Sequence, residues 1–271
     1  MVMNVLLITG AINIKSSLMS FLEVKNCEER LNQYIFSIKY AIDNYSLITH
    51  IVFCENTNYS FDYKELVEYA NQRCKVLEII KFNGNYEILY NKGKGYGEGE
   101  IIKFALKNSN ILNKSDAFYK LTGRVIIRNM DSVIHATKRR NAFIYYPSKI
   151  YRGNLSYIST IFYKSDRSFY ETNLINEYLK VDDKNQQFLE YLFLTILKNH
   201  PIKSFGVYPL ISGQSGTTGL NYDLSKSKIT IEEIVNFFGI HDLKQNSLSK
   251  TISSIIASLI KARYTMRKLK Q

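Results

Sequence analysis

The sequence lacks tryptophan and has only three prolines and three cysteines among its 271 residues. So little proline, together with 13 glycines, excludes a collagen-like or proline-rich disordered chain. Cys27, Cys54 and Cys74 lie far apart, so they form neither an even set for disulfides nor a closely spaced pair of metal ligands. This cysteine usage is typical of the reduced cytoplasm.

Long apolar runs are also missing. No run approaches the roughly 18–20 residues that a membrane-spanning helix needs. Residues 1–11 have no basic leader before their apolar stretch, so we expect no signal peptide. The predicted location is the cytoplasm, and any contact with the inner face of the plasma membrane is expected to be peripheral.

What the chain does have is an excess of positive charge. Its 36 Lys and Arg residues outnumber its 24 Asp and Glu residues, which gives a formal net charge of +12. Such a protein favours anionic partners: nucleic acid, phosphorylated small molecules or anionic lipid. The 21 tyrosines and 15 phenylalanines offer rings that suit sugar or base contacts, although we expect most of them in the core.

Buried-strand patterns alternate with helical patterns in the first part of the chain. Strands are predicted at residues 3–9, 47–54 and 76–82, and helices begin near Asn26 and Asp62. This alternation predicts an α/β fold with a mostly parallel sheet flanked by helices. Ligands of such sheets bind beyond the carboxyl ends of the strands, here at Thr9-Gly10, Glu55-Asn56 and Asn83-Gly84.

The same patterns continue to about residue 222. They predict strands at 117–121, 125–128, 142–146, 156–163 and 202–208, and helices at 100–112, 166–179 and 184–198. No repeat or linker interrupts them, so we predict one catalytic-type domain at 1–222 and a helical C-terminal region at 223–271.

Residues 93–99 have glycine at every second position. We expect a loop there, followed by a helix, and interpret it as a cradle for phosphate or sugar in which Lys94 and Gly95 contact the ligand. The alternative is a flexible surface loop. The segment is neither a Walker A loop nor a dinucleotide-binding G-x-G-x-x-G motif.

A second group of candidate residues follows the strand at 117–121. Lys120 is succeeded by Thr122, Gly123 and Arg124, and arginine is suited to bidentate recognition of phosphate. The alternative is that these charges are solvated at the edge of a strand.

Several short motifs in this order resemble one group of bacterial glycosyltransferases, those of capsule, O-antigen and lipooligosaccharide gene clusters. The motifs are LLITGAI, IVFCEN, NKGKGYGEGEI, FYKLTGR, FLEYLF and PLISGQSGTTG, within residues 1–222. The resemblance implies a GT-A-like fold with a nucleotide-sugar site at the ends of the first strands. It implies that Thr9, Gly10, Glu55 and Asn56 line the nucleotide pocket, and that Lys120 to Arg124 lie near the diphosphate.

One feature departs from that family. A typical GT-A enzyme has an Asp-x-Asp motif after the fourth strand, which holds Mg²⁺ or Mn²⁺ on the diphosphate, and here Thr122-Gly123-Arg124 stands at that place. Because Arg and Lys can stabilise the leaving diphosphate as a metal does, we expect a metal-independent enzyme without a cofactor. A role for Mg²⁺ or Mn²⁺ stays open as the alternative.

An inverting transfer needs a general base. Glu190 is the first candidate, because it is the single acid in an apolar helical stretch where burial would raise its pKa. Asp183 and Glu98 are the other candidates for the base. The alternative for Glu190 is that it is a partly exposed helix carboxylate without a catalytic role.

Ser215 lies in a Gly/Ser/Thr-rich segment, residues 209–222. This segment could bind substrate hydroxyls or be an ordinary loop.

The C-terminal segment Leu248–Gln271 combines aliphatic and basic residues. The aliphatic residues recur at helical spacing, at Ile252, Ile255, Ile256, Leu259 and Ile260, and six Lys and Arg residues accompany them. This pattern predicts a basic amphipathic helix that lies on an anionic membrane. The alternative is a helix that packs on its own domain.

These observations together favour a glycosyltransferase. Its donor would be a nucleotide-sugar, and its acceptor a growing lipid-linked glycan of the cell surface. Two other functions stay open: a basic protein that binds or modifies nucleic acid, and a non-catalytic scaffold of an envelope assembly complex. Since no helix-turn-helix, zinc or RNA-binding motif is present, we do not expect a nucleic-acid partner.

Overall fold

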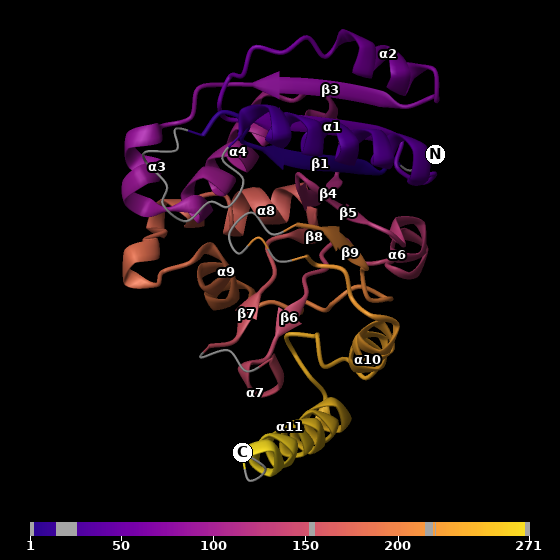
Figure 1. Ribbon diagram of the computed structural model, residues 1–271, viewed down its shortest axis with the longest axis vertical. Helices are drawn as coiled ribbons and strands as arrows, with labels where there is room; N and C mark the ends of the chain where they lie inside the picture. The colour runs from indigo at the N-terminus through magenta and orange to yellow at the C-terminus, as the bar shows by residue number, and fades with distance from the viewer. Residues whose placement is uncertain (1–2, 15–25, 152–154, 215–218, 220, 269–271) are drawn as a thin grey trace.

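The computed structural model describes residues 3–14, 26–151, 155–214, 219 and 221–268, without the side chains of 259–268. Its main sheet has the strand order β3-β2-β1-β4-β8 (Figure 1). The strands are β1 (Val5–Gly10), β2 (His50–Glu55), β3 (Val76–Lys81), β4 (Ala117–Thr122) and β8 (Phe162–Asp166). The first four run parallel and β8 is antiparallel to β4, so the predicted mostly parallel α/β sheet is confirmed.

Helices cover both faces of this sheet. On β1, Leu6 and Ile8 face one hydrophobic cluster and Val5 and Leu7 face the other, and all four are fully buried. Burial on both faces explains why the strands are continuous apolar runs. The first cluster includes residues of α1 (Cys27–Asn44) and α2 (Lys64–Asn71); the second includes residues of α4 (Lys94–Asn108), α5 (Asn110–Asn113), α8 (Arg167–Asn173) and α9 (Leu189–Leu197).

The predicted start of the first helix is confirmed. The side chain of Asn26 accepts hydrogen bonds from the backbone N–H groups of Glu28 at 2.8 Å and Glu29 at 3.3 Å. These bonds satisfy two of the donors that every helix leaves unpaired at its N-terminus. The cap fixes where α1 begins, and therefore which of its side chains face the end of β1.

The glycine-rich segment 93–99 is helical, so the predicted loop there is wrong. Helix α3 (Tyr86–Lys92) ends at Gly93, whose φ is +107°, and α4 begins at the next residue. A Cβ on Gly97 would lie 2.3 Å from Leu89 Cδ1, and one on Gly99 would lie 2.1 Å from Tyr178 Cβ. The glycines therefore let α4 pack closely on its neighbours, which outweighs their low helix propensity.

The second half of the chain forms shorter elements than predicted. The strand expected at 156–163 is divided between β7 (Tyr157–Ile158) and β8, and the helix expected at 166–179 ends at Asn173 and is followed by the 3₁₀ helix η2 (Glu177–Lys180). The helix expected at 184–198 begins only at Leu189, after η3 (Asp183–Asn185). Residues 202–208 form no strand, only a single bridge between Lys203 and Ala142.

Two small two-stranded sheets lie outside the main one. In the first, β5 (Val125–Ile127) pairs with β9 (Ile211–Gly213), a strand within the segment predicted as a loop. In the second, β6 (Tyr145–Tyr146) pairs with β7. The helix α6 (Met130–Ala136) follows β5, and it packs in the first hydrophobic cluster through Met130 and Val133.

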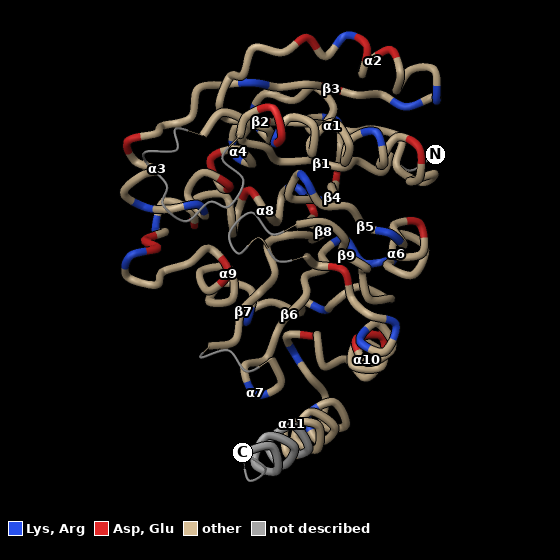
Figure 2. Tube along the Cα trace, in the orientation of Figure 1, with Lys and Arg blue, Asp and Glu red and all other residues tan. Residues whose placement is uncertain are grey.

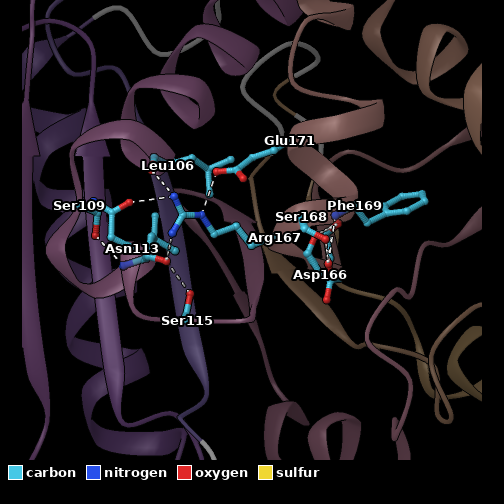
Figure 3. A network of polar contacts seen from close by, with 11 residues as sticks. Leu106, Ser109, Asn113, Ser115, Asp166, Arg167, Ser168, Phe169 and Glu171 are labelled. Atoms are coloured by element: carbon cyan, nitrogen blue, oxygen red, sulfur yellow. Dashed lines mark hydrogen bonds and ion pairs between the residues drawn. The ribbon is translucent and has the colours of Figure 1, made fainter.

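Arg167 connects the helices on the second face (Figure 3). From the start of α8 its guanidinium donates hydrogen bonds to the carbonyl oxygens of Leu106 at 3.3 Å and Leu112 at 3.1 Å, near the ends of α4 and α5. It also pairs with Glu171 at 2.8 Å. A cation that caps helix C-termini in this way fixes α4 against α8.

The C-terminal helices α10 (Lys226–Phe237) and α11 (Ser247–Lys268) lie at the opposite end of the molecule from β3 (Figure 1). The predicted C-terminal helix is confirmed. Its first turns pack on the protein, since Ile252 and Ile256 contact a small cluster made of Ile150, Val235 and Ile240 near α7 (Ser148–Tyr151). Among the described residues, no helix has the length and apolar character required to cross a membrane.

Candidate functional site

A cavity of about 620 Å³ opens at the carboxyl ends of β1, β2 and β4. The chain adds β2 and β3 on one side of β1 and then β4 on the other, so the order in which strands are added reverses between β1 and β4, although the two strands run parallel. In open α/β sheets this reversal leaves a crevice in which ligands bind. Thr9, Gly10, Asn56 and Thr122 line the cavity from the three strand ends.

The turn after β4 is built for close approach to β1. Gly123 N–H donates to Thr9 O at 2.8 Å, and a Cβ at Gly123 would lie 2.6 Å from that same oxygen. Arg124 follows in the left-handed region, with φ of +72°. Such a conformation is costly for a residue with a side chain, and strain of this kind is frequent at functional sites. The turn thereby places Arg124 on the wall of the cavity.

Two side chains of α1, which the sequence analysis did not select, support the segment after β1. Tyr34 Oη accepts a hydrogen bond from Ala11 N–H at 2.9 Å, and Arg30 Nε donates to Ala11 O at 2.8 Å. Both side chains line the cavity. An arginine four residues before a tyrosine on the buried face of a helix is the sequence pattern that could have revealed them.

Three cations gather at this end of the cavity: Arg30, Lys94 and Arg124. Burial lowers the pKa of Lys94, and the positive charges of Arg124 and Arg30 lower it further, while Asp183 opposes the shift. Arg124 Nη1 donates to Gln33 at 3.1 Å, whereas its buried Nε has no hydrogen-bond partner among the described residues. Elsewhere Lys and Arg are spread over the helices and strands (Figure 2). This end of the cavity is suited to an anion.

The segment after β2 contributes one wall residue and one structural residue. Glu55 is fully buried and does not line the cavity; its carboxylate accepts from the N–H groups of Thr57 at 2.8 Å and Tyr59 at 2.7 Å. Asn56 does line the cavity, and its buried Oδ1 has no partner among the described residues. Glu55 therefore holds the loop that presents Asn56.

Lys120 lies behind the cavity wall and is fully buried. Its ammonium donates to Thr122 Oγ1 at 2.8 Å and to Thr160 O at 2.7 Å, and it forms an ion pair with Glu98. Burial lowers the pKa of Lys120. Lys120 and Glu98 thus belong to one partly buried network, in which Lys120 positions Glu98 on the wall.

Glu190 lies in the first turn of α9 and lines the same cavity. Its carboxylate accepts a hydrogen bond from Thr160 Oγ1 at 3.1 Å. Burial raises the pKa of Glu190, and the nearby negative charges of Glu98 and Asp183 raise it further. A carboxylate with a raised pKa is a stronger base than an exposed one, so the geometry permits proton transfer at this position.

Asp183 connects the cationic and acidic parts of the cavity. The carboxylate accepts a hydrogen bond from the backbone N–H of Lys94 at 3.0 Å, at the start of α4, and burial raises its pKa. The N-terminus of α4 is therefore occupied in part by the carboxylate of Asp183, in the glycine-rich segment that was interpreted as a cradle for phosphate or sugar.

Most of the predicted site residues meet at this cavity. The predicted residues that line it are Thr9, Gly10, Asn56, Lys94, Gly95, Glu98, Thr122, Arg124, Asp183 and Glu190. Glu55, Lys120 and Gly123 lie behind its wall, and Ser215 lies outside the described residues. Besides Arg30 and Tyr34, the sequence analysis missed Thr160, Phe188 and Tyr222, because their positions depend on the fold of the second half of the chain.

The histidines, cysteines and acids in the described part of the chain form no group of three or more that could hold a metal ion. Where the Asp-x-Asp motif of GT-A enzymes would stand, the side chains are a hydroxyl and a guanidinium. Divalent cations such as Mg²⁺ prefer carboxylate and carbonyl oxygens. The residues at this position therefore do not fit a divalent cation.

No protein-family model matches the chain, and no curated protein matches it in sequence. The glycosyltransferase GlyE of Streptococcus pneumoniae TIGR4 is similar in structure, with a TM-score of 0.50 and 10% identity over 75% of this chain and 45% of GlyE. A proposed nucleotide-diphospho-sugar transferase of Desulfovibrio desulfuricans G20 has a TM-score of 0.42 and 11% identity, over 73% of this chain and 77% of that protein.

The mannosyltransferase Ktr4p of S. cerevisiae, solved with GDP, has a TM-score of 0.39 and 12% identity, over 70% of this chain and 63% of Ktr4p. Compared with GlyE, the chain spans less than half of that protein's length. The likeness to GlyE establishes the fold alone: a GT-A-like α/β sheet flanked by helices.

Proposed function

We propose that this protein transfers a sugar from a nucleotide-sugar donor to a hydroxyl group of an acceptor. The main support is that one cavity, at the point where the strand order reverses, combines a cationic end with a half-buried carboxylate whose pKa is raised. The GT-A-like fold adds support of a weaker kind, since fold alone does not determine function.

The donor diphosphate would lie at the cationic end. Arg124 and Lys94 line the cavity there, and the buried Nε of Arg124 is a donor without an acceptor among the described residues. The nucleoside would extend toward Asn56, whose buried Oδ1 is an acceptor with no donor in the described part of the chain. Charged hydrogen bonds to a diphosphate contribute about 1.5–3 kcal/mol each, which is enough to select a diphosphate.

Glu190 would be the general base. In the transfer, the acceptor oxygen forms a bond to the anomeric carbon and its proton passes to Glu190. The bond between that carbon and the diphosphate breaks, and its electron pair stays with the diphosphate, next to Arg124 and Lys94. Burial, with smaller contributions from the charges of Glu98 and Asp183, would keep the pKa of Glu190 raised, and a base in this role serves an inverting transfer.

We further propose that the leaving diphosphate is stabilised by these cations without a metal ion. The support is the donor set after β4, where Thr122-Gly123-Arg124 replaces two carboxylates by a guanidinium. The division into a transferase domain at 1–222 and a helical region at 223–271 also remains a proposal.

The acceptor is proposed to be a growing lipid-linked glycan of the capsule, O-antigen or lipooligosaccharide type, used at the cytoplasmic face of the membrane. The support is the resemblance in short motifs and the composition of the C-terminal helix. Ile255 in α11 is 54% exposed, and basic residues follow it along the helix. Basic residues near an anionic membrane surface contribute about 1 kcal/mol each.

A thermal-shift panel tests the proposed donor. The purified protein is heated with UDP-, GDP- and dTDP-sugars, each with and without EDTA. We expect one nucleotide class to raise the melting temperature, because a ligand that binds the folded state stabilises it, and EDTA to leave that shift unchanged. No shift with any nucleotide-sugar would contradict the function, and loss of the shift in EDTA would contradict metal independence.

A further inference from the structure

The cavity has a second end with different chemistry. At this end α9 and the segments beside it contribute Thr160, Ile161, Phe188, Leu189, Glu190 and Tyr222. None of these described residues is basic, and two have aromatic rings. Lys120, the cation nearest to Glu98, is already paired with it behind the wall, so Glu190 would repel an anionic group placed beside these rings.

The two rings are held in place by their surroundings. Phe188 immediately precedes α9 in an extended conformation, and its ring lies 5.6 Å from that of Tyr191 at 60°. Tyr222 N–H donates to Gly213 O at 2.8 Å, which fixes it to the end of β9. The next residue, Asp223, forms an ion pair with Arg128. Both rings are partly exposed and line the cavity that Glu190 lines.

A third ring lies near them. Tyr157 of β7 stacks on Tyr146, with ring centroids 5.1 Å apart. Burial raises the pKa of Tyr157 to about 12, and the charges of Glu190, Tyr191 and Tyr222 add to the shift. Aromatic rings with few polar groups are a frequent lining of ligand sites.

We infer that Phe188 and Tyr222 form the acceptor subsite, in which they stack on the C–H face of an uncharged pyranose and direct one of its hydroxyls to Glu190. This inference rests on the proposed function, since Glu190 takes the hydroxyl proton in that reaction. It goes beyond it by naming the acceptor chemistry. The reacting sugar is neutral, because a uronic acid or a sugar phosphate would place a second negative charge beside Glu190, whose hydrogen-bond partner Thr160 is uncharged.

Acceptor kinetics test this subsite. The acceptor probes are the methyl β-glycosides of glucose, galactose and N-acetylglucosamine. Methyl β-glucuronide is their negatively charged counterpart. The donor is the nucleotide-sugar identified by the thermal-shift panel. We expect the neutral probes to be preferred. In Phe188→Leu and Tyr222→Ala, the KM for the acceptor should rise about tenfold while the donor KM and the hydrolysis of donor by water stay within about twofold.

Two variants serve as controls. Tyr222→Phe keeps the ring and should retain the wild-type acceptor KM. Phe237→Leu removes a ring that is 83% exposed on α10, away from the cavity, and should change nothing. Saturation-transfer NMR gives a readout that does not need turnover: irradiation of aromatic protons of the wild-type protein should saturate the ring C–H protons of the neutral glycosides.

The inference is overturned if both Phe188→Leu and Tyr222→Ala keep the wild-type acceptor KM, or if the glucuronide is the better acceptor. It is also overturned if the wild-type protein saturates no ring C–H protons. A protein that neither binds nor hydrolyses any nucleotide-sugar would contradict the proposed function instead, and the donor assays without acceptor distinguish that result from the failure of the acceptor subsite.

Discussion

The two ends of the cavity are built in different ways. At the strand end, tight turns after β1 and β4 bring backbone and cations together, and Arg124 adopts a left-handed conformation to lie there. At the α9 end, a partly buried hydrogen bond from Thr160 holds Glu190 among aromatic and apolar residues. One end thus favours the charged part of a donor and the other a neutral hydroxyl. The difference predicts that mutations at the two ends have separable effects on binding and on chemistry.

The largest expected effect is at the α9 end. Glu190→Gln should lower kcat by about 10²–10⁴-fold, because the acceptor hydroxyl loses its general base. Nucleotide affinity, measured by calorimetry, should stay unchanged, since the donor end is intact. Glu233→Gln on the exposed side of α10 is the matched control. A kcat within tenfold of the wild type would remove Glu190 from the mechanism.

Lys120→Ala should lower the free energy of unfolding, in addition to any effect on donor binding. The substitution leaves Glu98 without its buried partner, and breaking such a pair costs about 3–5 kcal/mol of the free energy of unfolding. Because Glu98 is partly exposed, the lower end of that range is expected. Urea denaturation measures the change. A variant as stable as the wild type would show that Lys120 is not a structural part of the wall.

Arg124→Ala should weaken the donor end. The loss of one charged hydrogen bond predicts a decrease of about ten- to a hundredfold in kcat/KM for the donor, with little change in the free energy of unfolding. Arg140→Ala, at an exposed surface ion pair with Asp166, is the control. If the donor kcat/KM of Arg124→Ala equals that of the control, the cationic end does not bind the diphosphate.

The pH dependence should reveal the environment of Glu190. Activity requires the deprotonated carboxylate, so kcat should fall as the pH drops through the pKa of Glu190, which burial places above the ordinary value of 4.5. The hydrogen bond from Thr160 stabilises the charged form. In Thr160→Val the acid limb should therefore move to higher pH, and a limb that stays or moves to lower pH contradicts this assignment.

The smallest effect on catalysis is expected from the C-terminal helix. Deleting residues 259–271 leaves Ile252 and Ile256 on their cluster, so the protein should stay folded and keep its rate on short acceptors. It should lose co-sedimentation with anionic liposomes, in a salt-sensitive manner. Deleting residues 248–271 should in addition lower the melting temperature, because it exposes Ile150, Val235 and Ile240. Unchanged liposome binding by the shorter deletion would place membrane contact elsewhere.

The first half of the fold could be predicted from the sequence because its signals are local. Continuous apolar runs identify β1 and β2, and the cap at Asn26 identifies α1. Residues 93–99 were mispredicted because their glycines serve packing against Leu89 and Tyr178, and Tyr178 is distant from them in sequence. Periodicity and local propensity do not contain that information.

The site was predicted in part for the same reason. Strand ends are visible in the sequence, so Thr9, Asn56 and Arg124 could be selected, and Glu190 was found because a single acid in an apolar helix is conspicuous. Burial of Lys120 and the approach of Tyr222 to the cavity depend on tertiary contacts. Such contacts are not encoded by any short pattern.

A crystal structure with the nucleoside diphosphate selected by the thermal-shift panel tests the central claim most directly. We expect the diphosphate in the cavity at the ends of β1 and β4, with its oxygens within hydrogen-bond distance of Arg124 or Lys94, and the nucleoside on the side of Asn56. A nucleotide bound outside this cavity, or one whose diphosphate contacts neither cation, would contradict the account.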